Sequence, residues 1–252
     1  MSSKGYIVQI SDCHLFGDKN TRINGANAYA NLNSVLTNIK HLSLKPDLIV
    51  VSGDLSQDCT FESYQHLANL LNKVGIKYYL LPGNHDDINV MNKVFELNWI
   101  KENIDYFFEL NNWLVYIIDT SAYPDDSGTL SKNQLLKLQT TLTQNKINPT
   151  IIFMHHHPVK INSLWMDKMI LKESQKFNDI IGENSQVKAV LFGHIHQVFE
   201  RIINNTFYAS APSTSYQVLP NTEMFTVEKP IPGYRSINLE ENKLSSKIVW
   251  VE

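Results

Sequence analysis

The stretch Leu-Leu-Pro-Gly-Asn-His-Asp-Asp, residues 80–87, decides how this chain is organised. An apolar run ends abruptly at Pro82 and Gly83, and an amide, an imidazole and two carboxylates follow at once. This pattern predicts a buried strand that delivers polar side chains to a loop. Asn84 beside His85 suggests that one side chain holds a metal ion while the other moves a proton. Such a site needs further ligands from elsewhere in the chain.

Four other apolar runs end in the same way. Residues 6–10, 48–51, 150–154 and 187–192 read as strands, and each is followed by polar residues of types that bind metals. Within each of the Asp-x-His and His-x-His pairs the two residues are two positions apart, so an extended backbone would place both on one side. The candidate ligands from all five strand ends are Asp12, His14, Asp54, Asn84, His155, His194 and His196.

The spacing of apolar residues between these runs predicts helices. Residues 28–39 and 61–74 have the 3.6-residue period of amphipathic helices, a short helix is expected over 88–95, and Ser131 with Gln134 has capping-box spacing. Strands that alternate with helices predict a parallel sheet and the α/β class, in which sites form beyond the carboxyl ends of strands. The last quarter reads as strands and turns, including a strand at 224–227. Nothing resembles a linker, so residues 1–252 are expected to form one domain.

Composition restricts the class of protein. The 252 residues are 43% hydrophobic and 19% charged, with a net charge of −3, as in an ordinary globular protein. This charge predicts no basic surface for nucleic acid or an anionic membrane, and no apolar run is long enough to span a bilayer. Two cysteines are too few for a disulfide framework, and no signal peptide is recognisable, so a cytoplasmic location is expected.

The ligand types indicate which metals would bind. Seven nitrogen and oxygen donors exceed the needs of one tetrahedral site and suit two divalent ions that share a bridging carboxylate, for which Asp54 is the natural choice. Mixed imidazole and carboxylate ligands favour Fe, Mn or Zn over Ca or Mg. Each cluster alone is compatible with an ordinary polar loop, whereas five in succession are difficult to attribute to chance.

These motifs resemble those of the calcineurin-like metallophosphoesterases: Asp12-x-His14, Gly53-Asp54, Gly83-Asn84-His85-Asp86, His155-His156 and Gly193-His194-x-His196. The resemblance implies a four-layer α/β/β/α sandwich of two mixed β-sheets. It assigns one metal to Asp12, His14, Asp54 and His196, and the other to Asp54, Asn84, His155 and His194. Three histidines precede Pro158 where family members often have two, so His156 is the alternative to His155.

Longer segments, including Gly-His-Ile-His-Gln at 193–197, are similar to bacterial class III 3′,5′-cyclic AMP phosphodiesterases. This similarity implies hydrolysis of cyclic AMP to 5′-AMP by a metal-bridging hydroxide, with His85 as the catalytic group, and a homodimer is compatible with it. Trp165 and the loop 213–217 are candidates for the base and ribose pocket, and Asp86 is a candidate to orient His85. The residues expected to contact substrate are His14, Asp54, Asn84, His85 and His196.

Other functions fit the same motifs. A broader phosphodiesterase that acts on glycerophosphodiesters or 2′,3′-cyclic nucleotides would have the same ligand set, because only the pocket residues would differ. A non-catalytic scaffold on this fold is a hypothesis from a different class. Such scaffolds are expected to lack ligands or the catalytic histidine, and this chain retains all seven ligands and His85.

Overall fold

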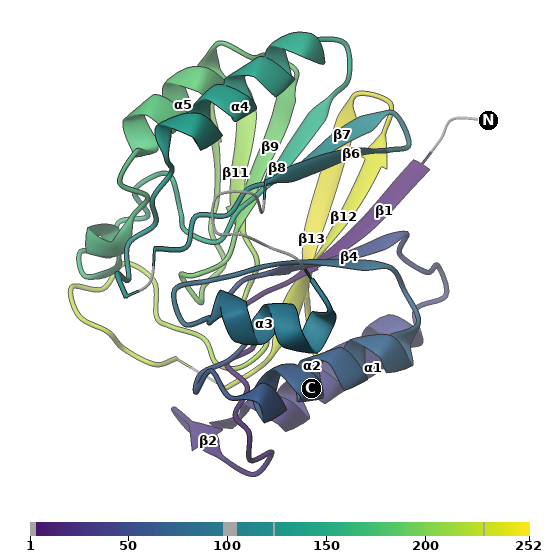
Figure 1. Cartoon of the computed structure of the whole chain (residues 1–252), viewed down its shortest axis with the longest axis vertical. Coiled ribbons are helices and arrows are strands. Elements are labelled where there is room, and N and C mark those ends of the chain that lie inside the picture. The colour runs from purple at the N-terminus through teal and green to yellow at the C-terminus, as the bar shows by residue number, and fades with distance from the viewer. Residues whose placement is uncertain (1–3, 98–104, 123, 229) are drawn as a thin grey trace.

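Two mixed β-sheets lie face to face between two layers of helices in the computed structural model of the chain (Figure 1). The structure describes residues 4–97, 105–122, 124–228 and 230–252. This arrangement is the predicted α/β/β/α sandwich, so the expected fold class is confirmed.

The first sheet has the strand order β13-β12-β1-β4-β5. Its three parallel strands are those that lead into the N-terminal ligand motifs, and β12 pairs antiparallel with β1, so the C-terminal part of the chain completes this sheet. The bounds are β1 (Lys4–Ile10), β4 (Leu48–Ser52), β5 (Tyr78–Leu81), β12 (Gly233–Glu240) and β13 (Lys243–Trp250).

The second sheet has the order β10-β11-β9-β8-β7-β6. Strands β7, β8, β9 and β11 are parallel to one another, while the edge strands β6 and β10 pair antiparallel with β7 and β11. The bounds are β6 (Tyr106–Leu110), β7 (Trp113–Ile117), β8 (Thr150–Phe153), β9 (Val187–Phe192), β10 (Glu200–Ile203) and β11 (Thr206–Ser210). A small ribbon, β2 (Arg22–Ile23) with β3 (Ala26–Asn27), precedes the first helix.

Helices cover the outer face of each sheet (Figure 1). The first sheet is covered by α1 (Ala28–Lys40), α2 (Phe61–Val74) and α3 (Ile88–Phe95), and the second by α4 (Lys132–Gln144) and α5 (Ser174–Gly182). Local sequence explains the ends of these helices. Thr60 caps α2 by accepting from the Ser63 amide, and Gly75 ends it with a left-handed backbone (φ 73°). Ser131 and Gln134 form the predicted capping box of α4.

Three buried apolar clusters separate the four layers. One lies between the two sheets and contains Ile7, Val50, Val115 and Ile151, while the other two lie between a sheet and its helices. Because both faces of each sheet are buried, the central strands are apolar on both sides, which is typical of parallel strands in α/β proteins. The polar residues that follow these strands therefore emerge at one rim of the sandwich.

Two features of the fold differ from the sequence prediction. Residues 224–227 form no strand, and only Val227 makes an isolated bridge, with Val218. Strand β6 was not predicted; its alternation of half-buried and exposed residues reflects its position at the edge of the second sheet. Both errors fall on segments whose structure depends on a neighbour rather than on their own apolar pattern.

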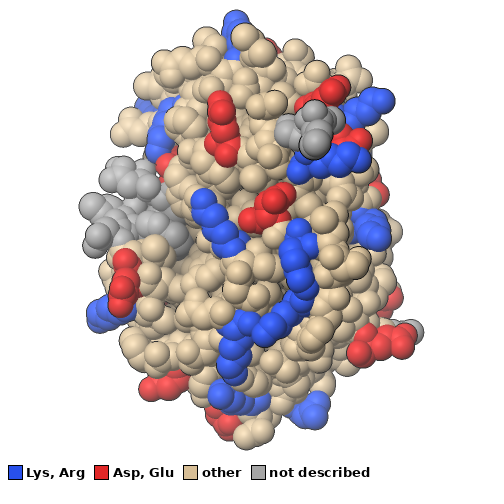
Figure 2. Space-filling view, turned by 90° about the vertical axis from the view of Figure 1, so that its right-hand side faces the viewer, with Lys and Arg blue, Asp and Glu red and all other residues tan. Residues whose placement is uncertain are grey.

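Charges of both signs are interspersed on the face of the molecule shown in Figure 2, where Lys and Arg form a narrow band with acidic side chains beside it. This face therefore has no broad basic surface. Among the residues that the structure describes, no helix is both long and apolar enough to cross a bilayer.

Candidate active site

All seven predicted ligands meet at one rim of the sandwich. They follow the carboxyl ends of β1, β4, β5, β8 and β9, and their side chains are nearly or fully buried. The potential metal-binding atoms form two groups, and within each group all of these atoms lie within 4.8 Å of one another. The first contains Asp12, His14, Asp54 and His196, and the second contains His155, His156 and His194.

The first group brings two imidazoles and two carboxylates together. His14 Nε2 lies 2.9 Å from His196 Nε2 and 3.6 Å from Asp54 Oδ2. His196 Nε2 lies 3.5 Å from Asp12 Oδ1. The Asp12 carboxylate also accepts a hydrogen bond from the His194 backbone amide at 3.0 Å, which connects the loop after β1 to the loop after β9.

The other oxygen of Asp54 and the Asn84 side chain lie beside the second group. His155 Nε2 lies 3.3 Å from Asp54 Oδ1 and 3.2 Å from Asn84 Oδ1. His194 Nδ1 lies 3.1 Å from the same Asn84 oxygen. Asp54 therefore faces both groups of donors, one with each carboxylate oxygen, as a bridging ligand can.

Hydrogen-bond polarity tests whether these atoms suit a cation. The Nδ1 atoms of His14 and His196 lie 2.7 Å from Gln57 Oε1 and 3.0 Å from the Tyr216 carbonyl oxygen; both oxygens only accept, so each Nδ1 carries a proton. The two Nε2 atoms then carry no proton, and their lone pairs face each other across 2.9 Å with carboxylates beside them. Such an arrangement is repulsive unless a cation lies among the four groups, so the residues present fit a metal ion.

The second group passes the same test. His155 Nδ1 lies 2.7 Å from the Ser52 carbonyl oxygen and donates to it. Its Nε2 therefore faces two acceptors, on Asp54 and Asn84, and needs either a proton or a metal ion between them. A metal that takes this place displaces the proton, as occurs whenever a histidine becomes a ligand.

Burial keeps the imidazoles of the first group in the form that binds metals. It lowers the pKa of His14 to about 3 and that of His196 to about 4. Burial also raises the pKa of Asp12 to about 6. For Asp54, burial opposes ionisation, but the neighbouring His155 and His14 outweigh it and hold the pKa of this carboxyl below its usual value. At neutral pH the group therefore presents neutral imidazoles and ionised carboxylates.

The backbone of these loops is strained. Five of the seven donors have positive φ angles: Asp12 54°, His14 45°, Asp54 51°, His194 68° and His196 49°. Each such residue costs of the order of 1–3 kcal/mol, and strain of this kind is typical of functional sites. Strand alternation does not bring Asp12 and His14 together as predicted, because β1 ends at Ile10 and both residues lie in the loop that follows it, with a left-handed backbone.

Glycines allow the ligand loops to approach one another. A Cβ atom on Gly83 would overlap the Asp54 carboxylate, and one on Gly193 would overlap the Ser11 hydroxyl. The Gly that precedes a ligand in these motifs is therefore required by close packing between loops.

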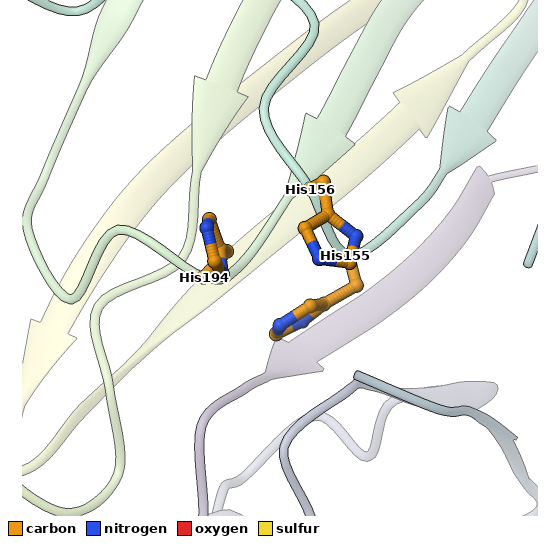
Figure 3. Close-up of side chains that lie close together, drawn as sticks. All are labelled: His155, His156 and His194. Atoms are coloured by element: carbon orange, nitrogen blue, oxygen red, sulfur yellow. The ribbon is translucent and has the colours of Figure 1, made fainter. Parts of the chain in front are cut away.

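His155 and His156 leave the chain in different directions (Figure 3). His155 reaches Asp54 and Asn84, whereas His156 Nδ1 lies 2.8 Å from the Thr120 hydroxyl. The centroid of the His156 ring is 4.6 Å from that of His194, so His156 packs behind the donors. His157 lies close to Asp167 and stacks on His194.

His85 lies beside the donors and is only partly buried. Its backbone amide donates to Asp54 Oδ1 at 3.0 Å, and its ring Nδ1 lies 3.3 Å from Gln57 Nε2. The Asp86 carboxylate does not orient this ring as expected. It accepts hydrogen bonds from the amides of Gly83, Leu55 and Ser56, and from the Tyr64 hydroxyl, and so holds the two ligand loops together.

A cavity of about 240 Å³ opens over the donors. Its floor includes His14, Asp54, Asn84, His85 and His196. Its upper wall is an aromatic rim, which we define as Trp165, Tyr216 and Phe225, with Met166, Met169 and Val218 beside it. The site can therefore hold a ligand with a phosphate at the donors and a flat apolar group at the rim.

The aromatic rim has a defined geometry. The Phe225 ring is in edge-to-face contact with two rings: its centroid lies 5.3 Å from that of Trp165 and 6.5 Å from that of Tyr216. Trp165 Nε1 donates to the Thr222 hydroxyl at 3.3 Å. Trp165 and the loop 213–217 were predicted as pocket residues from the sequence. Phe225 was missed, because the segment around it has neither a motif nor regular structure.

The chain was compared with protein families and with curated proteins. The sequence profile of the family Calcineurin-like phosphoesterase matches residues 5–198. A 3′,5′-cyclic-nucleotide phosphodiesterase from Nostoc sp. is 36% identical over 92% of this chain and 87% of its own length. The 3′,5′-cyclic adenosine monophosphate phosphodiesterase CpdA from Pseudomonas aeruginosa is 31% identical over 94% of this chain and 86% of its own length.

Solved structures support the fold at much lower sequence identity. A dimetal phosphatase from Danio rerio superposes with a TM-score of 0.71 and 11% identity, over the whole of both chains. A purple acid phosphatase from yellow lupin superposes with a TM-score of 0.69 and 12% identity, over 99% of this chain and 52% of that one. At these identities the likeness establishes the architecture alone.

Proposed function

The chain belongs to the calcineurin-like phosphoesterases, a family of hydrolases, and we propose that it is a dinuclear-metal phosphodiesterase that hydrolyses 3′,5′-cyclic AMP to 5′-AMP. The observation that carries the proposal is the convergence of seven buried donors around Asp54, several of which line a cavity with an aromatic rim. Relatives of nearly the same length are named as cyclic-nucleotide phosphodiesterases, which supports the choice of substrate.

The ligand set follows from the contacts. We assign Asp12, His14 and His196 to one ion and Asn84, His155 and His194 to the other, with Asp54 shared. The lone pairs that face one another in each group support this division. His155 is preferred to His156 because its Nε2 reaches both Asp54 Oδ1 and Asn84 Oδ1. Two bound divalent ions would polarise the phosphoryl group and supply a water of lowered pKa as nucleophile.

The protein side chains perform the remaining steps. His14, Asn84 and His196 line the cavity floor, where they border the position of the phosphate. His85 lines the same cavity and is not needed as a ligand, so it is free to donate a hydrogen bond or proton to the leaving ribose oxygen; groups of this kind contribute about 10²–10⁴-fold to the rate. The aromatic rim would stack on the adenine ring, an interaction worth about 1–3 kcal/mol per base in other proteins.

Several finer points stay proposals from the sequence. Fe or Mn is the preferred metal, and Zn also fits the nitrogen and oxygen donors. The proposed substrate is a small-molecule cyclic nucleotide, and the proposed location is the cytoplasm, with no nucleic acid or membrane as partner. The chain is proposed to form a single domain, and a homodimer is compatible with the family. Pairing of β12 with β1 supports the single domain, because it joins both ends of the described chain.

Substrate profiling tests the proposal. Protein loaded with Mn²⁺ or Fe²⁺ is assayed with cyclic AMP, cyclic GMP, 2′,3′-cyclic AMP, glycerophosphoethanolamine and bis(p-nitrophenyl) phosphate. We expect cyclic AMP to give the highest kcat/KM among the biological substrates. Turnover of glycerophosphoethanolamine or 2′,3′-cyclic AMP without turnover of cyclic AMP would establish the broader phosphodiesterase instead. No turnover of any diester by protein with both metals bound would favour the non-catalytic scaffold.

A further inference from the structure

The side chain of Gln57 lies between a metal-ligand candidate and the proposed catalytic histidine. Its Oε1 is 2.7 Å from His14 Nδ1, and its Nε2 is 3.3 Å from His85 Nδ1. The backbone holds it in this place, because the Gln57 amide donates to the Leu15 carbonyl at 2.8 Å, beside the bridge between Leu15 and Ser56. The rings of His14 and His85 are also in edge-to-face contact, with centroids 5.1 Å apart.

An amide has a fixed polarity, which makes this bridge directional. Its oxygen only accepts hydrogen bonds and its nitrogen only donates them. When His14 binds a metal through Nε2, its proton must be on Nδ1, where it donates to Gln57 Oε1. The amide nitrogen of Gln57 then faces His85 Nδ1 and can only donate to it. His85 Nδ1 must therefore be the acceptor, and the ring proton of His85 must be on Nε2.

The opposite orientation of the amide is incompatible with a bound metal. If the amide nitrogen faced His14, the Nδ1 of that ring would have to accept and its Nε2 would carry the proton. That proton would occupy the 2.9 Å gap to His196 Nε2, where the metal ion has to lie. Occupancy of the metal position at His14 therefore selects one orientation of Gln57.

We propose that Gln57 is a positioning residue that couples metal binding at His14 to the tautomer of His85, so that His85, as a neutral ring, presents an Nε2–H hydrogen-bond donor to the leaving oxygen only when the site is loaded. The inference rests on the assignment of His85 in the proposed function, but not on the identity of the substrate. It also gives His85 an orienting partner, since the expected one, Asp86, is hydrogen-bonded to the backbone of the ligand loops.

Two substitutions separate the polarity of the amide from its shape. Gln57→Met keeps the length of the side chain and removes both hydrogen bonds. Gln57→Glu keeps an acceptor for His14 but replaces the donor that faces His85 with a second acceptor, which requires a proton on His85 Nδ1. Gln139→Met, on the exposed face of α4, is the matched control for replacing a glutamine with methionine.

The direct measurement is the ¹⁵N NMR spectrum of the imidazole nitrogens in zinc-loaded protein, with the His85 signals identified by their loss in His85→Ala. We expect a proton on Nε2 alone in the wild type, a proton on Nδ1 in Gln57→Glu, and a mixture of tautomers in Gln57→Met. Zinc content is measured on the same samples and should be two ions per chain in the wild type and in both Gln57 variants. In Gln57→Met we expect kcat to fall about 10-fold with little change in KM, because one hydrogen bond that orients a reacting group is lost.

Three results would overturn the proposal. The first is a proton on His85 Nδ1 in the zinc-loaded wild type, and the second is the same His85 tautomer in the wild type and Gln57→Glu. The third is loss of zinc from Gln57→Met, which would assign Gln57 to metal retention. The spectra need no substrate, so failure of cyclic AMP as a substrate would leave this test intact.

Discussion

The floor and the rim of the cavity are built in different ways. The seven donors, of which His14, Asp54, Asn84 and His196 belong to the floor, follow five strand ends and are at most 9% exposed; hydrogen bonds between loops hold them, and five have a left-handed backbone. In the aromatic rim, Trp165 directly precedes a short 3₁₀ helix (Met166–Met169), Tyr216 and Phe225 follow β11, and Phe225 is 47% exposed. The floor is therefore prearranged for metal and phosphate, whereas the rim contributes contact area to the rest of the substrate. The chemistry should depend on the floor and the choice of substrate on the rim.

The largest expected effect is that of Asp54→Asn at the floor. Asp54 faces both groups of donors, so removal of its charge should weaken both metal positions. We expect loss of metal together with a fall in kcat/KM larger than the roughly 10⁴-fold that a single proton-transfer group contributes. Metal content by elemental analysis and activity on cyclic AMP measure the two effects. Asp179→Asn on the exposed face of α5 is the control, and an Asp54→Asn protein that keeps both metals would contradict the bridging role.

His85→Ala should have the next largest effect. The residue lines the cavity but is not needed to hold either ion, so both metals should remain while kcat falls by about 10²–10⁴-fold. Elemental analysis and initial rates with saturating cyclic AMP test this separation of roles. His41→Ala, at the exposed end of α1, is the matched control. Unchanged kcat in His85→Ala would remove this residue from the mechanism.

The smallest expected effect is that of Phe225→Ala or Trp165→Ala at the rim. Loss of a stacking face worth about 1–3 kcal/mol should raise KM for cyclic AMP by about 10-fold while kcat changes little. Glycerophosphoethanolamine has no aromatic ring, so any activity on it should be unaffected. Phe107→Ala, on the edge strand β6, is the control for loss of an exposed aromatic ring. Equal losses on both substrates would show that the rim supports the floor and does not select the base.

The strands, the helices and the ligand types could be predicted from the sequence because each has a local signal. Strand β9 and helix α2 have the predicted bounds, residues 187–192 and 61–74. The family was identified from the same motifs, and the match over residues 5–198 confirms it. Phe225 and strand β6 could not be found in this way, because their positions depend on partners distant in the sequence.

The sequence by itself determined which side chains are candidates to bind metal and to react, because donor types at strand ends and the glycines that precede them are local features. Only the tertiary structure decided how they are oriented. Five strand ends had to meet before His14 Nε2 could face His196, before Asp54 could face two groups of donors, and before His155 could reach Asp54. The role proposed for Gln57 also depends on the tertiary structure, because its amide can link His14 to His85 only when both rings lie beside it.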